Sequence, residues 1–217
     1  MKDLVFFIPA QTTNKYHELG DLAPFGDTTL LQWKISQCKL LVDSEKIFVS
    51  SASSRIKNIA NEEGVNHSDS EGDSIEERII FFSNQIKEKV IIWANATSPF
   101  LGHQEYKKMY KAFLENKCDL LFTVSEKQDY AFFNNQKINF KNEFIDRSLI
   151  DPIYICTNGA YIFEKEFAIK QKHLLDTENI YFYKLNKFTS IEIKNILDYS
   201  ISKELITMFF SEALRDI

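Results

Sequence analysis

The stretch FFIPAQTTNKYHELGDLAPFGDTTLLQW, residues 6–33, joins an apolar run to an amphipathic pattern through a long polar loop. The apolar run predicts a buried strand over residues 4–8. The spacing after the loop predicts a helix, with Asp27 or Thr28 as its N-cap. In α/β proteins, a glycine-rich loop that leads from a strand into a helix often binds the phosphates of a nucleotide. This loop instead reads QTTNK over residues 11–15 and has no glycine before Gly20. Its capacity to bind phosphate is the functional question that the sequence poses.

The rest of the chain alternates predicted strands with predicted helices. Further strands are predicted over residues 46–50, 90–94, 119–124, 158–163, 180–185 and 189–193. Helices are predicted in the intervals and over residues 195–215, and two of them begin at recognisable caps, Ser53 and the Ser74–Glu77 capping box. This order predicts an α/β fold with three α/β/α layers, Rossmann-like, in which a mostly parallel mixed sheet lies between helices. We expect one domain over residues 1–217.

Residues 126–157 interrupt the alternation. They contain two short strand-like runs, AFF and KINF, around a turn at Asn134-Asn135, and then an irregular segment. The pattern predicts a hairpin excursion from the sheet. Tyr130, Phe132 and Phe133 of this excursion would be exposed in a monomer, which favours contact with a neighbouring subunit of a homodimer.

Composition excludes several classes of protein. A formal charge of −5 without a basic block argues against nucleic-acid binding. No apolar run approaches the ~20 residues of a membrane span. The cysteines, Cys38, Cys118 and Cys156, are odd in number and far apart, which disfavours disulfides and a zinc site. We therefore expect a cytoplasmic protein. In open α/β sheets ligands bind at the carboxyl ends of the strands, so the loops after Ile8, Ser50, Ala94 and Ile193 should carry the site.

Motifs in these loops resemble those of the CMP-sugar synthetase family, which includes the acylneuraminate and 3-deoxy-octulosonate cytidylyltransferases. The family's N-terminal pattern, IPARxGSKxxxxKN followed by LxGxPLL, stands here as IPAQTTNKYHELGDLAPFGDTTLL. Residues 47–64 resemble IIVSTDDEEIAEIAKKYG, and residues 94–101, ANATSPFL, match LQPTSPLR. Residues 158–163, NGAYIF, match NGAIYIF with one residue fewer, and residues 191–204 match IDIDTxxDFxLAE. The matches follow the family's order and cover nearly the whole chain.

The resemblance implies a nucleotide-diphospho-sugar transferase-like fold and a cytidylyltransferase activity. An acidic sugar or phosphorylated acceptor would attack the α-phosphate of CTP, with Mg²⁺ as cofactor and pyrophosphate as leaving group, in surface-glycan precursor synthesis. The nucleotide-binding residues that it implies are Ala10, Gln11, Thr12, Thr13, Asn14, Lys15, Gly72 and Ser74. The acceptor-binding residues are Asn95, Thr97, Ser98, Arg147, Tyr154 and Asn158.

Charged residues at two places in the sequence are expected to be catalytic. Lys15 falls at the position of the family's loop lysine, and its compact ammonium suits a phosphate. The late motif carries Glu192 and Lys194 where the family has paired aspartates that hold magnesium. On a strand over residues 190–193 both side chains would point to the same face. We expect Glu192 to hold one Mg²⁺ and Lys194 to contact a phosphate oxygen.

Other departures keep a second class of function open. Gln11 replaces the family's loop arginine, Thr12-Thr13-Asn14 replaces Gly-Gly-Ser, and Ala52 replaces a common aspartate. A degenerate homologue that binds a nucleotide or a partner protein without catalysis is therefore the alternative to an active enzyme. Retention of Lys15, Glu192 and Asp198 favours the enzyme. A glycosyltransferase would want a DxD metal motif at a strand end, and the sequence has none there.

Purely structural interpretations of the same residues also stand. Asn158-Gly159 fits a turn at a strand entry, and Thr97-Ser98-Pro99 fits the cap of the next helix. Arg147 could pair with Asp146 or Asp151 on the surface. Glu192 and Lys194 could form a surface ion pair worth less than ~1 kcal/mol.

Overall fold

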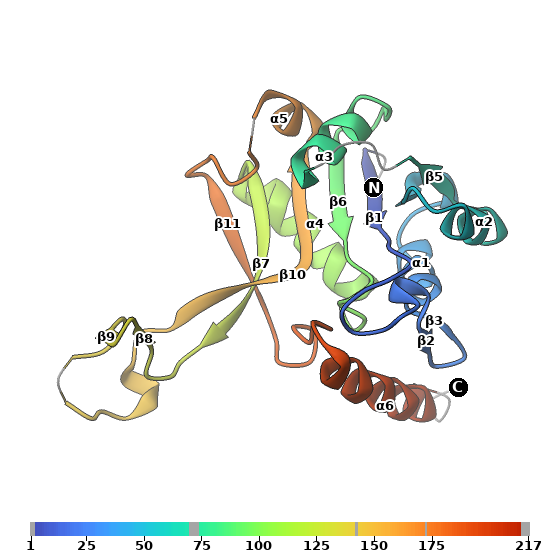
Figure 1. Ribbon diagram of the computed structural model, residues 1–217. Coiled ribbons are helices and arrows are strands. Elements are labelled where there is room, and N and C mark those ends of the chain that lie inside the picture. The colour runs from blue at the N-terminus through green and yellow to red at the C-terminus, as the bar shows by residue number, and fades with distance from the viewer. Residues whose placement is uncertain (1–2, 70–73, 142, 172, 214–217) are drawn as a thin grey trace.

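The computed structural model describes residues 3–69, 74–141, 143–171 and 173–213 (Figure 1). In these ranges seven strands form one sheet in the order β11-β7-β10-β6-β1-β4-β5. The strands are β1 (Leu4–Pro9), β4 (Ile47–Ser50), β5 (Asn66–Ser68), β6 (Val90–Ala94), β7 (Leu120–Lys127), β10 (Ile153–Glu164) and β11 (Ile180–Leu185). Only β10 runs antiparallel to its neighbours in this sheet. The predicted fold class, a mostly parallel mixed sheet with helices, is confirmed.

Helices cover both faces of the sheet because the central strands are apolar on both sides. Helices α1 (Leu30–Lys39), α2 (Ser54–Glu62) and α4 (His103–Asn116) pack on one face, and α3 (Ile75–Ser83) and α5 (Lys165–Lys170) pack on the other. Strand β1 shows the alternation: Phe6 belongs to the first core cluster, and Val5 and Phe7 belong to the second. Every residue of β6 is buried, as its apolar sequence predicts.

The last helix, α6 (Ile196–Ala213), lies at the carboxyl edge of the sheet, below the ends of β1 and β6 in Figure 1. Tyr199 of α6 packs against Tyr16 and donates its hydroxyl to the carbonyl oxygen of Pro24. A third apolar cluster, which includes Phe25 and Phe100, fills the space between α6 and the loops of this edge. Among the described helices, none combines the length and apolar character needed to span a bilayer.

Two predicted helix caps are wrong. Helix α1 is capped by Thr29, whose Oγ1 accepts from the backbone N–H of Gln32 at 3.2 Å, and not by Asp27 or Thr28. Thr28–Thr29 instead forms the short strand β3, which pairs with β2 (Pro24–Phe25). Helix α4 has Gly102 as its N-cap, so Thr97-Ser98-Pro99 does not cap it. The predicted capping box is confirmed: Ser74 Oγ accepts from Glu77 N, and Glu77 Oε2 accepts from Ser74 N, both at 3.1 Å.

The excursion is a projecting arm whose base is made of sheet strands (Figure 1). Strand β7 continues to Lys127 and β10 already begins at Ile153, so both ends of the predicted excursion are paired strand. The arm carries β8 (Phe132–Phe133), β9 (Gln136–Lys137) and the short helix η3 (Arg147–Leu149). Its turn residues Asn134 and Asn135 have positive φ angles of 47° and 62°, which asparagine tolerates well.

The aromatic residues of the arm differ in exposure. Phe132 and Phe133 are 59% and 67% exposed, as expected. Tyr130 is half-buried and not exposed, because its ring packs edge-on against Phe140 and its hydroxyl accepts from the backbone N–H of Ile145 at 2.8 Å. The arm therefore has a small aromatic core of its own and exposes Phe132 and Phe133 on its surface.

Residues 189–193 do not form the predicted strand. Asn186 Oδ1 accepts from the backbone N–H groups of Phe188 and Thr189, both at 2.9 Å, and turns the chain out of the sheet after β11. Ile193 N donates to the carbonyl oxygen of Thr97 at 2.8 Å, which ties the segment to the loop after β6. The alternating isoleucines that suggested a strand pack in the third apolar cluster instead.

Candidate functional site

A cavity at the carboxyl edge of the sheet brings together several of the predicted site residues. We call it the central cavity. Five residues predicted from the sequence line it: Gln11, Asn14, Asn95, Thr97 and Asn158. Six further lining residues had no predicted role: Pro9, Asp21, Ile75, Trp93, Ala96 and Tyr161. The loop after β1 thus faces the loop after β6 and the middle of β10 across one space, as the rule for open α/β sheets predicts.

The loop after β1 is built around the buried carboxylate of Asp21. Asp21 Oδ2 accepts from the backbone N–H of Gln11 at 2.7 Å, and Oδ1 accepts from the hydroxyl of Tyr16 at 2.6 Å. The backbone N–H of Asp21 donates back to the carbonyl oxygen of Gln11 at 2.8 Å. Burial raises the pKa of Asp21, although both hydrogen bonds to its carboxylate oppose this shift. Burial also raises the pKa of Tyr16, so this hydroxyl stays protonated and donates. Asp21 therefore fixes the shape of the loop.

Gly20 allows the loop to close on itself. Its φ angle is +52°, and a Cβ at this position would lie 2.3 Å from the carbonyl oxygen of Gln11 and 2.7 Å from the amide nitrogen of Thr13. No side chain can be accommodated that close to backbone atoms. The glycine that the sequence places late in the loop is thus required by the fold of the loop, and it is the only described residue between 10 and 23 with a positive φ angle.

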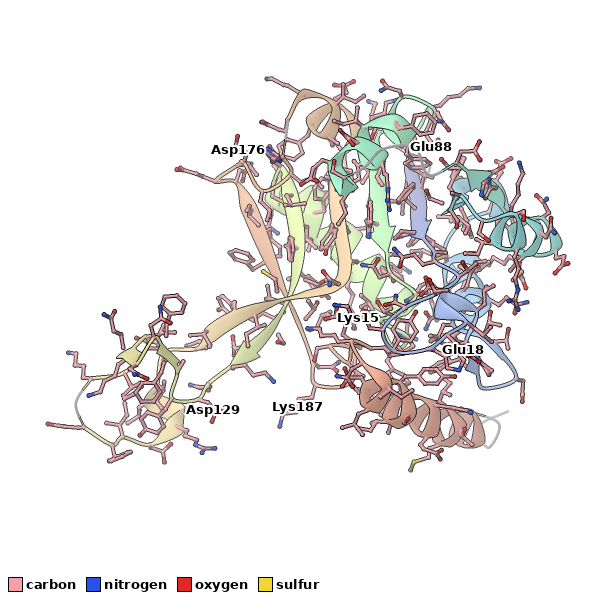
Figure 2. The ribbon with its side chains drawn as sticks, viewed as in Figure 1. Lys15, Glu18, Glu88, Asp129, Asp176 and Lys187 are labelled. Atoms are coloured by element: carbon pink, nitrogen blue, oxygen red, sulfur yellow. The ribbon has the colours of Figure 1, made fainter. Side chains whose placement is uncertain are left out.

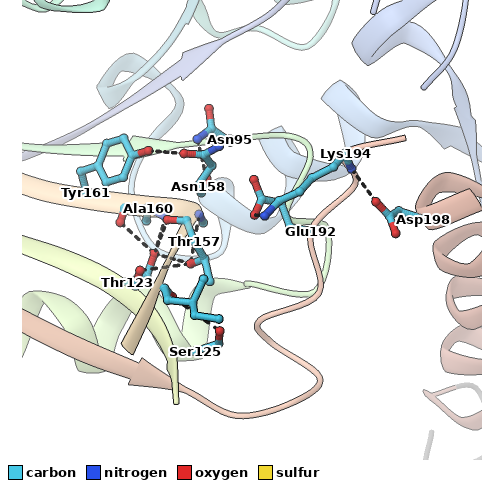
Figure 3. A network of polar contacts seen from close by, with 12 residues as sticks. Asn95, Thr123, Ser125, Thr157, Asn158, Ala160, Tyr161, Glu192, Lys194 and Asp198 are labelled. Atoms are coloured by element: carbon cyan, nitrogen blue, oxygen red, sulfur yellow. Dashed lines mark hydrogen bonds and ion pairs between the residues drawn. The ribbon is translucent and has the colours of Figure 1, made fainter. Parts of the chain in front are cut away.

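The opposite wall of the central cavity is a chain of side-chain hydrogen bonds (Figure 3). Trp93 Nε1 donates to Asn95 Oδ1 at 3.0 Å, and Asn95 Nδ2 donates to the carbonyl oxygen of Asn158. Tyr161 donates its hydroxyl to Asn158 Oδ1 at 2.6 Å. Burial, with a smaller effect from the charge of Glu192, raises the pKa of Tyr161 to about 12. Asn95 uses both ends of its amide within the protein, so in this state it orients Asn158.

Asn158 reaches the cavity because β10 contains a bulge between Cys156 and Tyr161. Thr123 Oγ1 fills the bulge: it accepts from Ala160 N at 3.1 Å and from Thr157 Oγ1 at 2.8 Å (Figure 3). A Cβ on Gly159 would lie only 3.1 Å from Thr123 Oγ1. Asn158-Gly159 is therefore part of a β-bulge that exposes Asn158 on one side and packs tightly on the other.

A second cavity lies on the other side of the loop after β1, and we call it the loop cavity. It shares Pro9 and Gln11 with the central cavity. Its other lining residues are Phe7, Ala10, Thr12, Thr13, Ser50, Ser51, Ala52, Ser53 and Arg78. Four predicted nucleotide-binding residues, Ala10 to Thr13, therefore lie here. Arg78 was not predicted, because its sequence position indicated only a turn of helix α3.

The remaining predicted residues that lie within the described ranges line neither cavity. The Lys15 side chain is exposed on the loop, at the edge of the sheet that faces α6 (Figure 2). Ser74 is the N-cap of α3, Ser98 is buried beneath its loop, and Gly72 lies outside the described residues. Arg147 and Tyr154 lie on the arm.

On the arm, both of these side chains have partners within the chain. Arg147 Nη1 is 3.2 Å from Asp129 Oδ1, so its ion-pair partner is neither Asp146 nor Asp151. The Tyr154 ring stacks on that of Phe182, with ring centroids 6.2 Å apart and an interplanar angle of 30°. Within a single copy the arm therefore does not bring Arg147 or Tyr154 to the lining of the central cavity.

Glu192 and Lys194 are adjacent although no strand holds them. Lys194 Nζ is 3.0 Å from Glu192 Oε2, and the side chains are 60% and 7% exposed respectively. The backbone N–H of Lys194 donates to Asp198 Oδ2 at 3.0 Å, which fixes the start of α6 (Figure 3). Among the described residues, no group of three His, Cys, Asp or Glu side chains could hold a metal ion. One carboxylate suits a magnesium ion held mainly by water and substrate phosphates, and it does not form a metal site by itself.

The loop after β6 is held from below by helix α1. Lys34 is fully buried, and its Nζ donates to the carbonyl oxygens of Ser98 at 2.9 Å and Leu101 at 2.7 Å and contacts the Tyr106 hydroxyl at 3.0 Å. Trp33 Nε1 donates to the carbonyl oxygen of Pro99 at 2.7 Å. Burial lowers the pKa of Lys34 to about 7. The helix thereby sets the position of the cavity wall that contains Thr97.

Comparisons with known proteins give one family and one fold. Residues 20–209 match the family described as cytidylyltransferase. No curated protein matches the sequence. The fold is similar to that of CMP:2-keto-3-deoxy-manno-octonic acid synthetase complexed with CTP, with a TM-score of 0.76 and 10% identity over 95% of this chain and 99% of that one.

Two further solved structures share the fold. A cytidylyltransferase from Leptospira borgpetersenii serovar Hardjo-bovis has a TM-score of 0.67 and 16% identity over 95% of this chain and 87% of its own. The 4-diphosphocytidyl-2C-methyl-D-erythritol synthase from Anaerococcus prevotii has a TM-score of 0.69 and 11% identity over 94% of this chain and 96% of its own. At these identities the likeness establishes the fold alone.

Proposed function

Because this chain belongs to the cytidylyltransferase family, we propose that it transfers CMP from CTP to a small acidic sugar or phosphorylated acceptor and releases pyrophosphate. The product would be a precursor of a surface glycan. The choice of CTP is supported by the CTP complex whose fold this chain shares. The choice of an acidic or phosphorylated acceptor rests on the CMP-sugar synthetase motifs of the sequence.

One observation carries the proposal. The two segments with separate proposed roles, the nucleotide loop and the acceptor-binding residues, line the same cavity, with Gln11 and Asn14 on one side and Asn95, Thr97 and Asn158 on the other. A transfer between two substrates needs both of them in one site, with the reacting atoms held in contact. A separate nucleotide pocket and a distant acceptor pocket would not support a transfer.

In the proposed reaction an oxygen of the acceptor, either a phosphate oxygen or a hydroxyl oxygen that gives up its proton to water, forms a bond to the α-phosphorus of CTP. The bond from that phosphorus to the bridging oxygen breaks, and pyrophosphate leaves with the electron pair. Such a step needs neutralisation of negative charge more than covalent participation of the protein. Lys15, exposed beside the loop, would approach the triphosphate, and Lys194 would contact a phosphate oxygen. If Mg²⁺ takes part, Glu192 would be its protein ligand, and the ion would neutralise charge on the leaving group.

We propose that the arm completes the acceptor site in a homodimer. Arg147 and Tyr154 lie on the arm and away from the central cavity of their own copy. An arm that contacts a second copy would bring its guanidinium to an acceptor carboxylate or phosphate, which a fork of two N–H groups binds well. The exposed Phe132 and Phe133 would provide the apolar contact.

Pyrophosphate release tests the function directly. The protein is incubated with each of the four nucleoside triphosphates and Mg²⁺, against a panel of acidic sugars and phosphorylated acceptors. We expect release with CTP and at least one acceptor, and weaker release with the other triphosphates. Lys15→Ala should reduce binding of CTP in calorimetry far more than it changes the melting temperature. Absence of CTP binding at millimolar concentration, with and without acceptors, would reject the proposal.

A degenerate homologue that binds a nucleotide or a partner without catalysis is the second candidate. Two observations favour it: Gln11 leaves the loop without the family's arginine, and Lys194 already pairs with Glu192 at 3.0 Å. CTP binding without pyrophosphate release for any acceptor would favour this candidate over the enzyme.

A further inference from the structure

The two cavities beside the loop after β1 contain little positive charge for a triphosphate. Gln11 and Asn14 are neutral, and the one acidic lining residue, Asp21, is already engaged by Gln11 and Tyr16. Lys15 lines neither cavity. Among the described residues, Arg78 is the one lysine or arginine that lines either cavity. A bound triphosphate would therefore need Arg78 or a charge from outside the two cavities.

We propose that Arg78, together with the loop cavity, binds the terminal phosphates of the nucleotide and supplies the positive charge that Gln11 does not. This inference rests on the proposed function, because it names the part of the substrate that the loop cavity would hold. The ligand class is a pyrophosphate group, either as the end of CTP or as the free leaving group.

The loop cavity offers the donors that an anion requires. The backbone N–H groups of Thr12 and Thr13 donate to no acceptor in the part of the chain that the structure describes. Ser51 Oγ accepts from the backbone N–H of Ser53 at 3.2 Å, which leaves the Ser51 hydroxyl proton to donate. Thr12, Thr13 and Ser53, which each carry a hydroxyl, line the same space. Consecutive amide groups, hydroxyls and a guanidinium are the donors with which proteins bind phosphate.

Helix α3 places Arg78 on the side of the helix that borders both cavities. Ile75 lines the central cavity and Arg78 lines the loop cavity. Residues three apart lie on the same side of a helix, so one side of α3 borders both spaces. The capping box at Ser74 fixes this end of the helix. Arg78 is itself half-buried, so its charge acts in a medium of lower dielectric constant than water. A polyphosphate could thus extend from the central cavity past Gln11 to Arg78.

Binding measurements on matched variants test the inference. Calorimetry is carried out with CTP, CMP and inorganic pyrophosphate on the wild type, Arg78→Ala, Arg78→Lys and Arg55→Ala. Arg55 is the control because it is an exposed arginine on the neighbouring helix α2 and lines neither cavity. We expect Arg78→Ala to weaken binding of CTP and pyrophosphate by about 10- to 100-fold, as for a lost charged hydrogen bond, and to change CMP binding by less than about threefold. Arg78→Lys should be intermediate and Arg55→Ala unchanged.

The outcomes separate this inference from the proposed function. If the wild type binds CTP and pyrophosphate, and Arg78→Ala binds each of them as tightly as the wild type does, the inference is wrong and the cytidylyltransferase proposal stands. If the wild type binds pyrophosphate through Arg78 but no nucleotide, the anion site stands and the cytidylyltransferase proposal fails. Binding of neither ligand by the wild type overturns both. Should Arg78→Ala lower the melting temperature, Arg78→Gln replaces it, because glutamine keeps a polar side chain without the charge.

Discussion

Replacing Lys34 by methionine should change how the stability of the protein depends on pH. The ordinary lysine pKa of 10.5 falls to about 7 in the folded protein because the ammonium is completely buried. Between these values the unfolded chain binds a proton that the folded chain does not, so the free energy of unfolding rises with pH. This contribution is complete above pH 10.5 and is lost as the pH falls through about 7. Methionine has a similar shape and no titratable group.

The size of the effect follows from the same two pKa values. Each pH unit in the window corresponds to about 1.4 kcal/mol. Between pH 7 and pH 9 the wild type should therefore gain about 2 kcal/mol relative to Lys34→Met, because the lysine is half protonated at the lower limit. Measurements stop at pH 9 because the ordinary pKa of Cys38, whose thiol is influenced by the charge of Lys34, is 9.0.

Urea unfolding of both proteins at pH 7, 8 and 9 provides the measurement, with Lys57→Met as the control. Lys57 is exposed on α2, so its replacement should leave the pH dependence unchanged. Free energies of wild type and Lys34→Met that run parallel within about 0.5 kcal/mol over this range would refute the reasoning. That result would mean that the carbonyl oxygens of Ser98 and Leu101 keep the ammonium charged in the folded protein.

Three further predictions concern the loop, the ion pair and the arm. Gly20→Ala should destabilise the protein by more than about 2 kcal/mol, because the new Cβ would meet backbone atoms. Gly64→Ala is the control: Gly64 has a φ angle of +66° and open space around it, so the substitution should cost only about 1 kcal/mol. Equal melting temperatures of the two variants would contradict this prediction. Lys194→Ala should lower the turnover of pyrophosphate release by ~100-fold if Lys194 stabilises the transferred charge. A change within about twofold would leave Lys194 as no more than the ion-pair partner of Glu192. Light scattering should give twice the chain mass of 25.4 kDa, and Phe133→Asp should give the monomer; a monomeric wild type at micromolar concentration would exclude the dimer.

The sequence predicts the fold well where local pattern and tertiary packing agree. Strand β6 is apolar throughout and is buried throughout, and the Ser74 capping box forms as predicted. The strand over residues 189–193 fails because alternating isoleucines can also pack against α6, and alternation alone does not distinguish the two. Strand β5 is too short and too polar to give a signal.

The site is predicted less completely, because cavity walls combine residues that are distant in sequence. The motif resemblance identifies Asn95 and Asn158 as site residues. The hydrogen bond between them, however, depends on a β-bulge that no local sequence pattern predicts. Arg78 lies on helix α3, for which the sequence indicated only a capping box and an apolar face. Lys34 left one sign in the sequence: it is spaced three and four residues from the buried Leu31 and Cys38, which puts a lysine on an apolar helix face.

Strand β10 runs as one strand from the base of the arm at Ile153, through the bulge that holds Asn158, to the far end of the sheet at Glu164. The same element therefore carries the proposed contact between copies and one wall of the central cavity. Suppose that the arm binds a second copy and that this association changes the affinity for a ligand that displaces Asn158. That ligand must then change the association constant by the same factor. Dilution of the protein would then act as an inhibitor of substrate binding, and substrate would promote assembly.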